Sequence, residues 1–131
     1  NDPYEVLAVS VFDYAAISPD MPFMTFASKW RPTSRRYKMI QPTIMRPTSE
    51  PRLHHAITLV TREVAETFGM RGYFRIDLRE RDDEVFVIDI NPNPDINQAS
   101  GFAFQAKSAG YSYDEIVCRI VEEALQYVAS A

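Results

Sequence analysis

The sequence holds little cysteine or glycine and lacks any long apolar run. Its 131 residues include one cysteine and four glycines. A single cysteine excludes an internal disulfide, so a reducing compartment is expected. No apolar stretch approaches the roughly 18 to 20 residues that span a bilayer, and no secretory signal opens the chain. The expected location is therefore the cytoplasm, with no membrane as a partner.

A surplus of basic charge is also missing. The formal net charge is −4 at pH 7 and the sequence pI is about 5.1, which argues against a general nucleic-acid-binding surface. Five cations do fall between Lys29 and Lys38. Because such clusters most often form a solvated surface, no nucleic-acid partner is expected.

The sequence does contain enough apolar material for a core. Hydrophobic residues make up 46% and aromatic residues 12% of the chain, which suits one globular domain over residues 1–131. The apolar stretch 5–14 is typical of a strand buried on both faces. Such a strand needs neighbours, and Asn1 is not an initiator residue. We therefore expect the chain to be part of a longer protein.

A proline-rich stretch is followed by a helical pattern. Most of the nine prolines lie between residues 17 and 51, which predicts a loop-rich crossing. A helix is predicted over 51–68, with Ser49 as its cap and Gly69 at its end. Apolar residues at spacings of three and four form its predicted buried face. They are Leu53, Ile57, Val60, Val64 and Phe68.

Two further helices are predicted near the C-terminus. The shorter one covers about 99–109 and stops at Gly110. The last one opens with Ser112 and Glu115, which have capping-box spacing. Cys118 lies in this helix without a nearby histidine, so packing is expected rather than a nucleophilic role. The predicted buried face of the last helix comprises Ile116, Ile120, Val121, Ala124, Leu125 and Val128.

Between these helices the sequence predicts a β-hairpin. Strands are expected over 73–80 and 85–90, joined by a three-residue acidic loop at 82–84. Side chains alternate across each strand, which gives each one an apolar face. These faces comprise Phe74, Ile76 and Leu78 in the first strand and Phe86, Ile88 and Ile90 in the second.

The opposite face of the hairpin gathers oxygen atoms. A three-residue loop places Asp77 across from Asp89, and Arg75 across from Asn91. Facing β-carbons lie about 4.5 to 5.5 Å apart, so two carboxylates and an amide oxygen can converge. Such oxygen ligands suit a hard divalent cation held together with a nucleotide. The alternative is that Asp77 pairs with Arg75 or Arg79 on a solvated face.

Residues 72–110 read GYFRIDLRERDDEVFVIDINPNPDINQASGFAFQAKSAG. This stretch resembles the D-alanine–D-alanine ligases of the ATP-grasp superfamily. In that family an arginine-x-aspartate strand precedes an acidic-x-asparagine strand, a proline turn and a helix ending in Ala-Gly. The resemblance extends more weakly over 5–128. It implies an α+β fold, the C-terminal subdomain of an ATP-grasp enzyme, with a mainly antiparallel sheet packed with helices.

The resemblance also implies residue roles in the hairpin. It makes Asp77, Asp89 and Asn91 the ligands of Mg²⁺, with Mn²⁺ as an alternative. Asp89 stands where the family more often has glutamate, so its oxygens are drawn back by one methylene. Arg75 matches an arginine that steadies the transferring phosphate, a role suited to a permanently charged planar fork.

Two residues outside the hairpin are implicated in the same way. Lys29 matches a lysine that approaches the nucleotide phosphates. Ser100 falls where family members present a hydroxyl to the acceptor substrate. The usual Pro-Gly before it is here Pro94-Asp95, which adds charge and puts a D-alanine substrate in doubt.

The activity implied is ATP-dependent ligation. A small carboxylate or amino-acid substrate attacks the γ-phosphate of ATP to give an acyl phosphate, from which an amine then displaces phosphate. The chain has too few glycines for a glycine-rich phosphate-covering loop, and the other domains of such a ligase are implied as partners. We therefore expect negligible ligase activity from the isolated chain. A homodimer is left open.

Other functions compete with this interpretation. The chain could be a non-catalytic binding domain derived from a ligase. It could also be a magnesium nuclease that uses Asp77 and Asp89. His54 and His55 are unsuited to chelating one ion together, because adjacent helical positions point about 100° apart.

Overall fold

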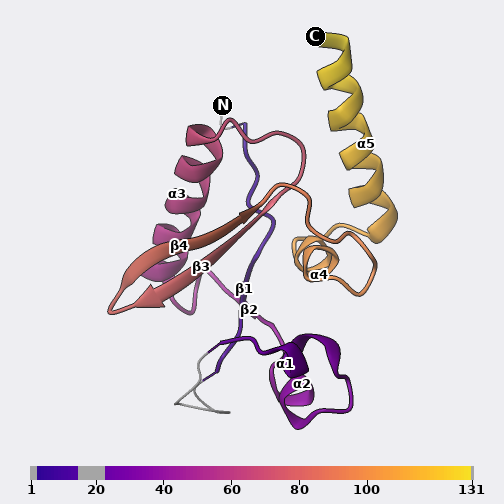
Figure 1. The fold of residues 1–131 in the computed structure, drawn as a ribbon. Helices are drawn as coiled ribbons and strands as arrows, with labels where there is room; N and C mark the ends of the chain where they lie inside the picture. The colour runs from indigo at the N-terminus through magenta and orange to yellow at the C-terminus, as the bar shows by residue number, and fades with distance from the viewer. Residues whose placement is uncertain (1–2, 15–22, 131) are drawn as a thin grey trace. The chain divides into compact units, whose positions relative to one another are not determined.

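The computed structural model describes residues 3–14 and 23–130. Helices and short strands are both present, which confirms the expected α+β class (Figure 1). The strands form two separate pairs, β1 with β2 and β3 with β4. The elements are β1 (Val9–Val11), α1 (Phe26–Trp30), α2 (Arg35–Met39), β2 (Thr43–Met45), α3 (Pro51–Thr67), β3 (Arg75–Arg81), β4 (Glu84–Asn91), α4 (Gly101–Ser108) and α5 (Tyr113–Ser130).

The described residues form two compact units. One contains the residues up to Val9 together with those from Met45 onward, and the other lies between Ser10 and Ile44. The expected single domain over 1–131 stays a prediction. The long strand predicted over 5–14 is wrong, because only Val9–Val11 is a strand in that stretch.

In the smaller unit, α1 and α2 are short and held by hydroxyl groups. Thr25 and Ser28 cap the start of α1 reciprocally, with the Ser28 hydroxyl accepting from the Thr25 amide at 2.7 Å. Ser34 caps α2, and its hydroxyl also donates to the carbonyl oxygen of Ala27 at 2.9 Å. From residue 23 onward, the proline-rich crossing therefore contains two short helices that the sequence pattern did not predict.

Helix α3 occupies the predicted range, but its start and one end of its buried face differ. Its N-cap is Glu50, whose side chain makes no capping bond, so Ser49 is not the cap. At the other end Gly69 adopts φ 57°, and the Met70 amide donates to the Ala65 carbonyl at 2.8 Å. This is the Schellman arrangement, which favours glycine. Phe68 is 64% exposed and so does not belong to the buried face.

The N-terminal segment connects the end of α3 to the start of α5. The Tyr4 hydroxyl donates to the Ala65 carbonyl at 3.2 Å. Glu5 forms an ion pair with Arg119 at 2.6 Å and accepts a hydrogen bond from the Tyr111 hydroxyl at 3.0 Å. The hydrogen bond from Arg119 holds the pKa of Glu5 below its usual value. Two polar side chains thus fix this segment at both sides.

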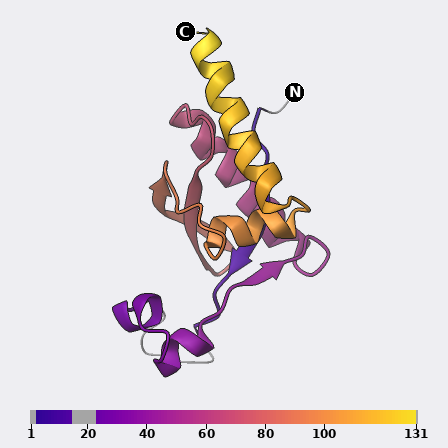
Figure 2. The same cartoon turned by 90° about the vertical axis from the view of Figure 1, so that its right-hand side faces the viewer.

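The main core of the larger unit lies where α4 meets α5. Phe102, Ala106 and Ile116 are its buried residues. The predicted capping box is confirmed, because the Ser112 amide donates to Glu115 at 2.7 Å and the Glu115 amide donates to the Ser112 hydroxyl at 3.2 Å. Figure 2 shows α5 leading away from α4 toward the C-terminus.

The outer half of α5 is more exposed than its sequence predicts. Val121, Leu125 and Val128 are 52%, 64% and 72% exposed, so the predicted buried face ends early along this helix. Cys118 is also exposed, which makes the expected packing role wrong. Among the helices described here, α5 included, none is both long and apolar enough to cross a membrane.

Candidate metal and phosphate site

The open end of the β3–β4 hairpin brings together four of the site residues predicted from the sequence. The strands are antiparallel, with Asp77 directly opposite Asp89 and Arg75 directly opposite Asn91. Both pairings match the prediction. Because paired residues of an antiparallel sheet share a face, all four side chains lie on one side of the hairpin.

The turn end is built differently from the prediction. Arg81 pairs with Glu84, so the connection is two residues long rather than three. Its residues, Asp82 and Asp83, have φ values of 54° and 64°. Two successive positive φ values are typical of a type I′ turn, whose twist matches that of the flanking strands. Aspartate tolerates this region better than most residues because its short side chain bonds locally.

A β-bulge accounts for the difference in strand register between the turn end and the open end of the hairpin. Leu78 pairs with Val87 while Asp77 pairs with Asp89, which leaves Ile88 without a partner across the ladder. One extra residue in one strand is the definition of a bulge, and it changes which side chains share a face. Ile88 is accordingly 60% exposed.

The bulge also corrects the predicted apolar face of β4. Val87 shares a face with Leu78, whereas Phe86 shares a face with Arg79. The guanidinium of Arg81 lies 5.4 Å from the centroid of the Phe86 ring, a cation–π contact. Of the three residues predicted for the apolar face of β4, Ile90 lies opposite Ile76 on that face, Phe86 lies on the other face, and Ile88 is the unpaired bulge residue. Helix α3 contacts β4 within the same unit, and both appear beside each other in Figure 1.

Arg75 and Asp77 form a two-bond ion pair. The Arg75 Nε donates to Asp77 Oδ1 at 2.6 Å and its Nη2 donates to Oδ2 at 3.0 Å. The two side chains are 38% and 39% exposed. Asp77 therefore pairs with Arg75, which is one of the two alternative partners considered in the sequence analysis. Asp89 is exposed and has no hydrogen-bond or ion-pair partner among the described residues.

Asn91 begins a run of side chains that bond to the backbone ahead of them. Its Oδ1 accepts from the Asn93 amide at 2.9 Å, and Asn93 Oδ1 accepts from the Tyr73 hydroxyl at 2.7 Å. Further on, Asp95 Oδ1 accepts from the Asn97 amide at 2.9 Å. Such turns fix a loop without regular structure. Asn91 Oδ1 keeps a second lone pair with which it can bind a cation.

Ser100 lies at the end of this loop, and Lys29 lies elsewhere. The Ser100 hydroxyl oxygen accepts from the Ala103 amide at 3.1 Å and caps α4. Its hydrogen stays able to donate to a ligand. Lys29 lies in the last turn of α1, in the smaller unit, so its approach to a nucleotide stays a prediction.

The donor set of the open end fits a hard cation. Two carboxylates and one amide supply only oxygen, which Mg²⁺ and Mn²⁺ prefer. Within the described ranges, no group of three or more His, Cys, Asp and Glu side chains is placed to hold a metal. A cation here would therefore depend on Asn91 and on oxygens from a nucleotide or water, as is common for magnesium.

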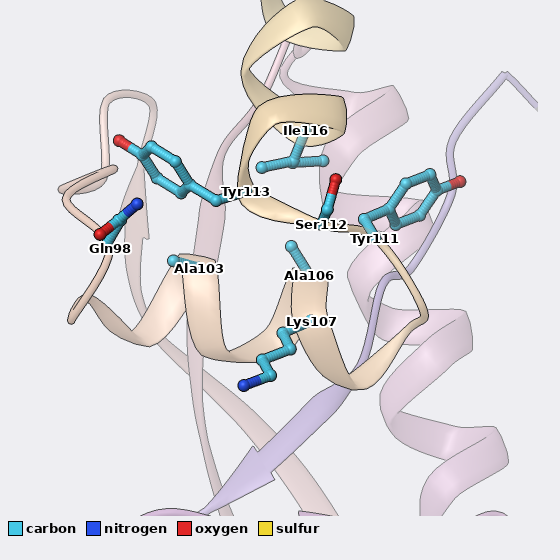
Figure 3. A pocket seen from close by; sticks show the side chains of 8 residues that line it. All are labelled: Gln98, Ala103, Ala106, Lys107, Tyr111, Ser112, Tyr113 and Ile116. Carbon is cyan, nitrogen blue, oxygen red and sulfur yellow. The ribbon is translucent and has the colours of Figure 1, made fainter.

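A separate hollow lies between α4 and the first turn of α5 (Figure 3). Its volume is about 340 Å³, near the lower end for small-molecule sites. None of the site residues predicted from the sequence lines it. The small side chains of Ala103 and Ala106 leave this space, a signal visible in the sequence only once the two helices are known to meet. Its lining comprises Gln98, Ala103, Ala106, Lys107, Tyr111, Ser112, Tyr113 and Ile116.

The α+β fold, with an antiparallel hairpin that carries Asp77, Asp89 and Asn91, is consistent with the C-terminal part of an ATP-grasp protein. Residues 5–122 match the family described as the D-ala D-ala ligase C-terminus. The chain therefore belongs to that family.

Individual relatives of the chain are consistent with this family. The chain is 32% identical over 81 residues to the D-alanine–D-alanine ligase of Petrotoga mobilis, a match covering 62% of this chain and 27% of that protein. The corresponding enzyme of Marinobacter nauticus is 28% identical over 110 residues, or 83% and 32% of the two chains. That of Actinobacillus succinogenes is 31% identical over 118 residues, or 89% and 36%. The chain thus spans about a third of the length of these relatives. No solved structure matches it significantly.

Proposed function

We propose that this chain is the metal- and phosphate-binding portion of an ATP-dependent carboxylate–amine ligase. The observation that carries the proposal is the pairing of Asp77 with Asp89 beside Asn91 at the open end of the hairpin. The family to which the chain belongs supports it, since the named relatives are D-alanine–D-alanine ligases. The substrates are ATP and a small carboxylate or amino acid, which reacts through an acyl phosphate.

In this proposal Asp77, Asp89 and Asn91 hold Mg²⁺, or Mn²⁺ in its place. The bound cation would offset negative charge on the β- and γ-phosphate oxygens of ATP. The three side chains come from two paired strands, so their positions depend on the sheet register and not on a mobile loop. The exposure of Asp89 leaves room for phosphate oxygens and water to complete the coordination.

Three other side chains complete the proposed site. Arg75 donates hydrogen bonds to the transferring phosphate, and Lys29 binds the nucleotide phosphates. Ser100 presents its hydroxyl to the acceptor substrate. Asp95, bonded to the Asn97 amide, adds a negative charge near this position, and we propose that it selects an acceptor other than a simple D-alanine.

The rest of the ligase is expected in other domains of the parent enzyme. With only four glycines the chain lacks a glycine-rich phosphate-covering loop, so nucleotide affinity and turnover would depend on those domains. The isolated chain would then bind metal but turn over little ATP. Because the reaction consumes ATP, we propose that it takes place in the cytoplasm.

The metal site can be tested by titrating Mn²⁺ into the full chain and following free Mn²⁺ by electron paramagnetic resonance. Asp77→Asn removes one ligand charge, and we expect Mn²⁺ affinity to fall at least about tenfold, as is usual when a metal site is disturbed. Asp83→Asn is the matched control, because it makes the same change in charge at the turn end of the hairpin. Its affinity should stay within about twofold of the parent.

Two results would count against the proposal. One is equal Mn²⁺ affinity in Asp77→Asn and in the parent chain. The other is no Mn²⁺ binding by a parent chain that circular dichroism shows to be folded, with or without a non-hydrolysable ATP analogue. The second result would favour the non-catalytic binding domain.

A further inference from the structure

Both oxygens of Asp77, the central carboxylate of the proposed metal site, are already engaged by Arg75. The two hydrogen bonds measure 2.6 and 3.0 Å and come from two different nitrogens of one guanidinium group. This side-on fork is the geometry in which arginine binds carboxylates most strongly. The pair lies on one strand, two residues apart, and on the face that also carries Asp89 and Asn91.

A guanidinium group and a divalent cation cannot occupy the same position on one carboxylate. They are both positive, and a cation bound to Asp77 would lie within a few ångströms of Arg75, where like charges repel. The ion pair is also weakly held, since both partners are more than a third exposed and water screens them. Displacing Arg75 therefore costs little compared with what two carboxylates and an amide gain by binding a divalent ion.

We propose that Arg75 is a displaceable counter-ion, which a divalent cation releases from Asp77 so that the guanidinium becomes free to bind phosphate. This inference rests on the proposed function, because it assumes that Asp77 is a metal ligand. It adds that metal binding and the availability of the phosphate-binding arginine are coupled through one carboxylate. Arg75 is then a competitor of the metal for Asp77 as well as a ligand for the nucleotide.

A purely structural role for Arg75 predicts the opposite effect on metal binding. If Arg75 serves to orient Asp77, its removal loosens the carboxylate and weakens cation binding. If Arg75 competes with the cation, its removal frees both Asp77 oxygens and strengthens cation binding. The sign of the change in affinity therefore separates the two roles.

The decisive variant is Arg75→Met, which keeps much of the side-chain length and removes the charge. In the full chain and without nucleotide, we expect Mn²⁺ to bind about three- to tenfold more tightly, in line with the strength of an exposed two-bond ion pair. Arg81→Met is the matched control. It removes the same charge from the same strand, about 20 Å away by strand rise, and its Mn²⁺ affinity should change less than twofold.

Two further measurements separate lost charge from lost geometry. Arg75→Lys keeps the charge but cannot form the fork, and its affinity should fall between those of the parent and Arg75→Met. In the unaltered chain, adding Mg²⁺ should shift the NMR signal of the Arg75 Nε–Hε group as its 2.6 Å bond breaks. The corresponding Arg81 signal should stay in place.

The outcomes distinguish this inference from the proposed function. The counter-ion role is overturned if Arg75→Met binds Mn²⁺ no more tightly than the parent chain does and the Arg75 NMR signal does not shift when Mg²⁺ is added. The metal site itself then still stands, provided that Asp77→Asn lowers the affinity. If neither the parent chain nor Arg75→Met binds Mn²⁺, both proposals fail together.

Discussion

The two ends of the β3–β4 hairpin obey different registers. At the turn, Arg81 pairs with Glu84 and the connection is a tight two-residue turn. At the open end, Asp77 pairs with Asp89, which is one residue out of step with the turn. Continued without interruption, the register of the turn would place Asp77 opposite Ile88. The bulge at Ile88 is therefore what assembles the candidate site.

This difference shows how a hairpin can satisfy two requirements separately. The turn needs a twist that suits its strands, which favours two residues with positive φ. The site needs two carboxylates and an amide on one face, which requires the other register. A single extra residue between the two ends meets both needs, at the cost of one exposed isoleucine.

The largest expected effect comes from changing the residue count at the bulge. An alanine inserted between Ile88 and Asp89 would move Asp89 opposite Ile76, on the other face from Asp77. We expect Mn²⁺ affinity to fall at least about tenfold. Deleting Ile88 is the matched control, because it removes the bulge but leaves Asp77 opposite Asp89. Its Mn²⁺ affinity should stay within about threefold of the parent.

The same pair of variants can contradict the conclusion that the bulge sets the register of the candidate site. Tight Mn²⁺ binding by the insertion variant would mean that a wider bulge absorbs the extra residue. Loss of binding in the deletion variant would mean that the local twist of the bulge, and not the register alone, positions the carboxylates. Cross-strand contacts seen by NMR between residue 77 and its partner would identify the register in each variant.

The sequence was sufficient to predict the pairing at the open end, but not the loop length or the bulge that produces this pairing. A three-residue loop without a bulge and a two-residue loop with one both place Asp77 opposite Asp89. The stretch Val85 to Ile90 is apolar at odd and even positions alike, so alternation cannot decide which residues face α3. The Asp82–Asp83–Glu84 run likewise suits either loop length.

Other differences between the sequence-based predictions and the structure share a physical cause. Helical spacing identified the apolar side of α5 but could not show what covers it, and the stripe from Val121 to Val128 is exposed. The positions of Arg75 and Asp77 on one face followed from alternation, whereas their two hydrogen bonds depend on side-chain rotamers. Periodicity predicts faces, and it says little about partners.

A second pair of variants tests which face each residue of β4 occupies. Val87 lies opposite Leu78 and is 39% exposed, whereas Ile88 is 60% exposed. Val87→Asn should lower the free energy of unfolding by about 1 to 2 kcal/mol, since it places an amide on the apolar face. Ile88→Asn should cost about 0.5 kcal/mol or less.

Urea denaturation of the two variants provides the measurement, and neither substitution changes the net charge. A greater loss for Ile88→Asn than for Val87→Asn would contradict the bulge. In the unbulged register with a three-residue loop, Ile88 would be the residue opposite Leu78, and the ranking of the two variants would be reversed.

The smallest expected effect concerns the turn alone. Asp83 has φ 64° and stands at the second position of the turn, where glycine meets no steric penalty. Asp83→Gly should therefore raise the free energy of unfolding by about 0.5 to 1 kcal/mol, helped by the removal of one carboxylate from an acidic cluster. Thermal unfolding measures the gain, and Mn²⁺ affinity should be unchanged because the bulge separates the turn from the site. A change in Mn²⁺ affinity would show that the two ends of the hairpin are coupled after all.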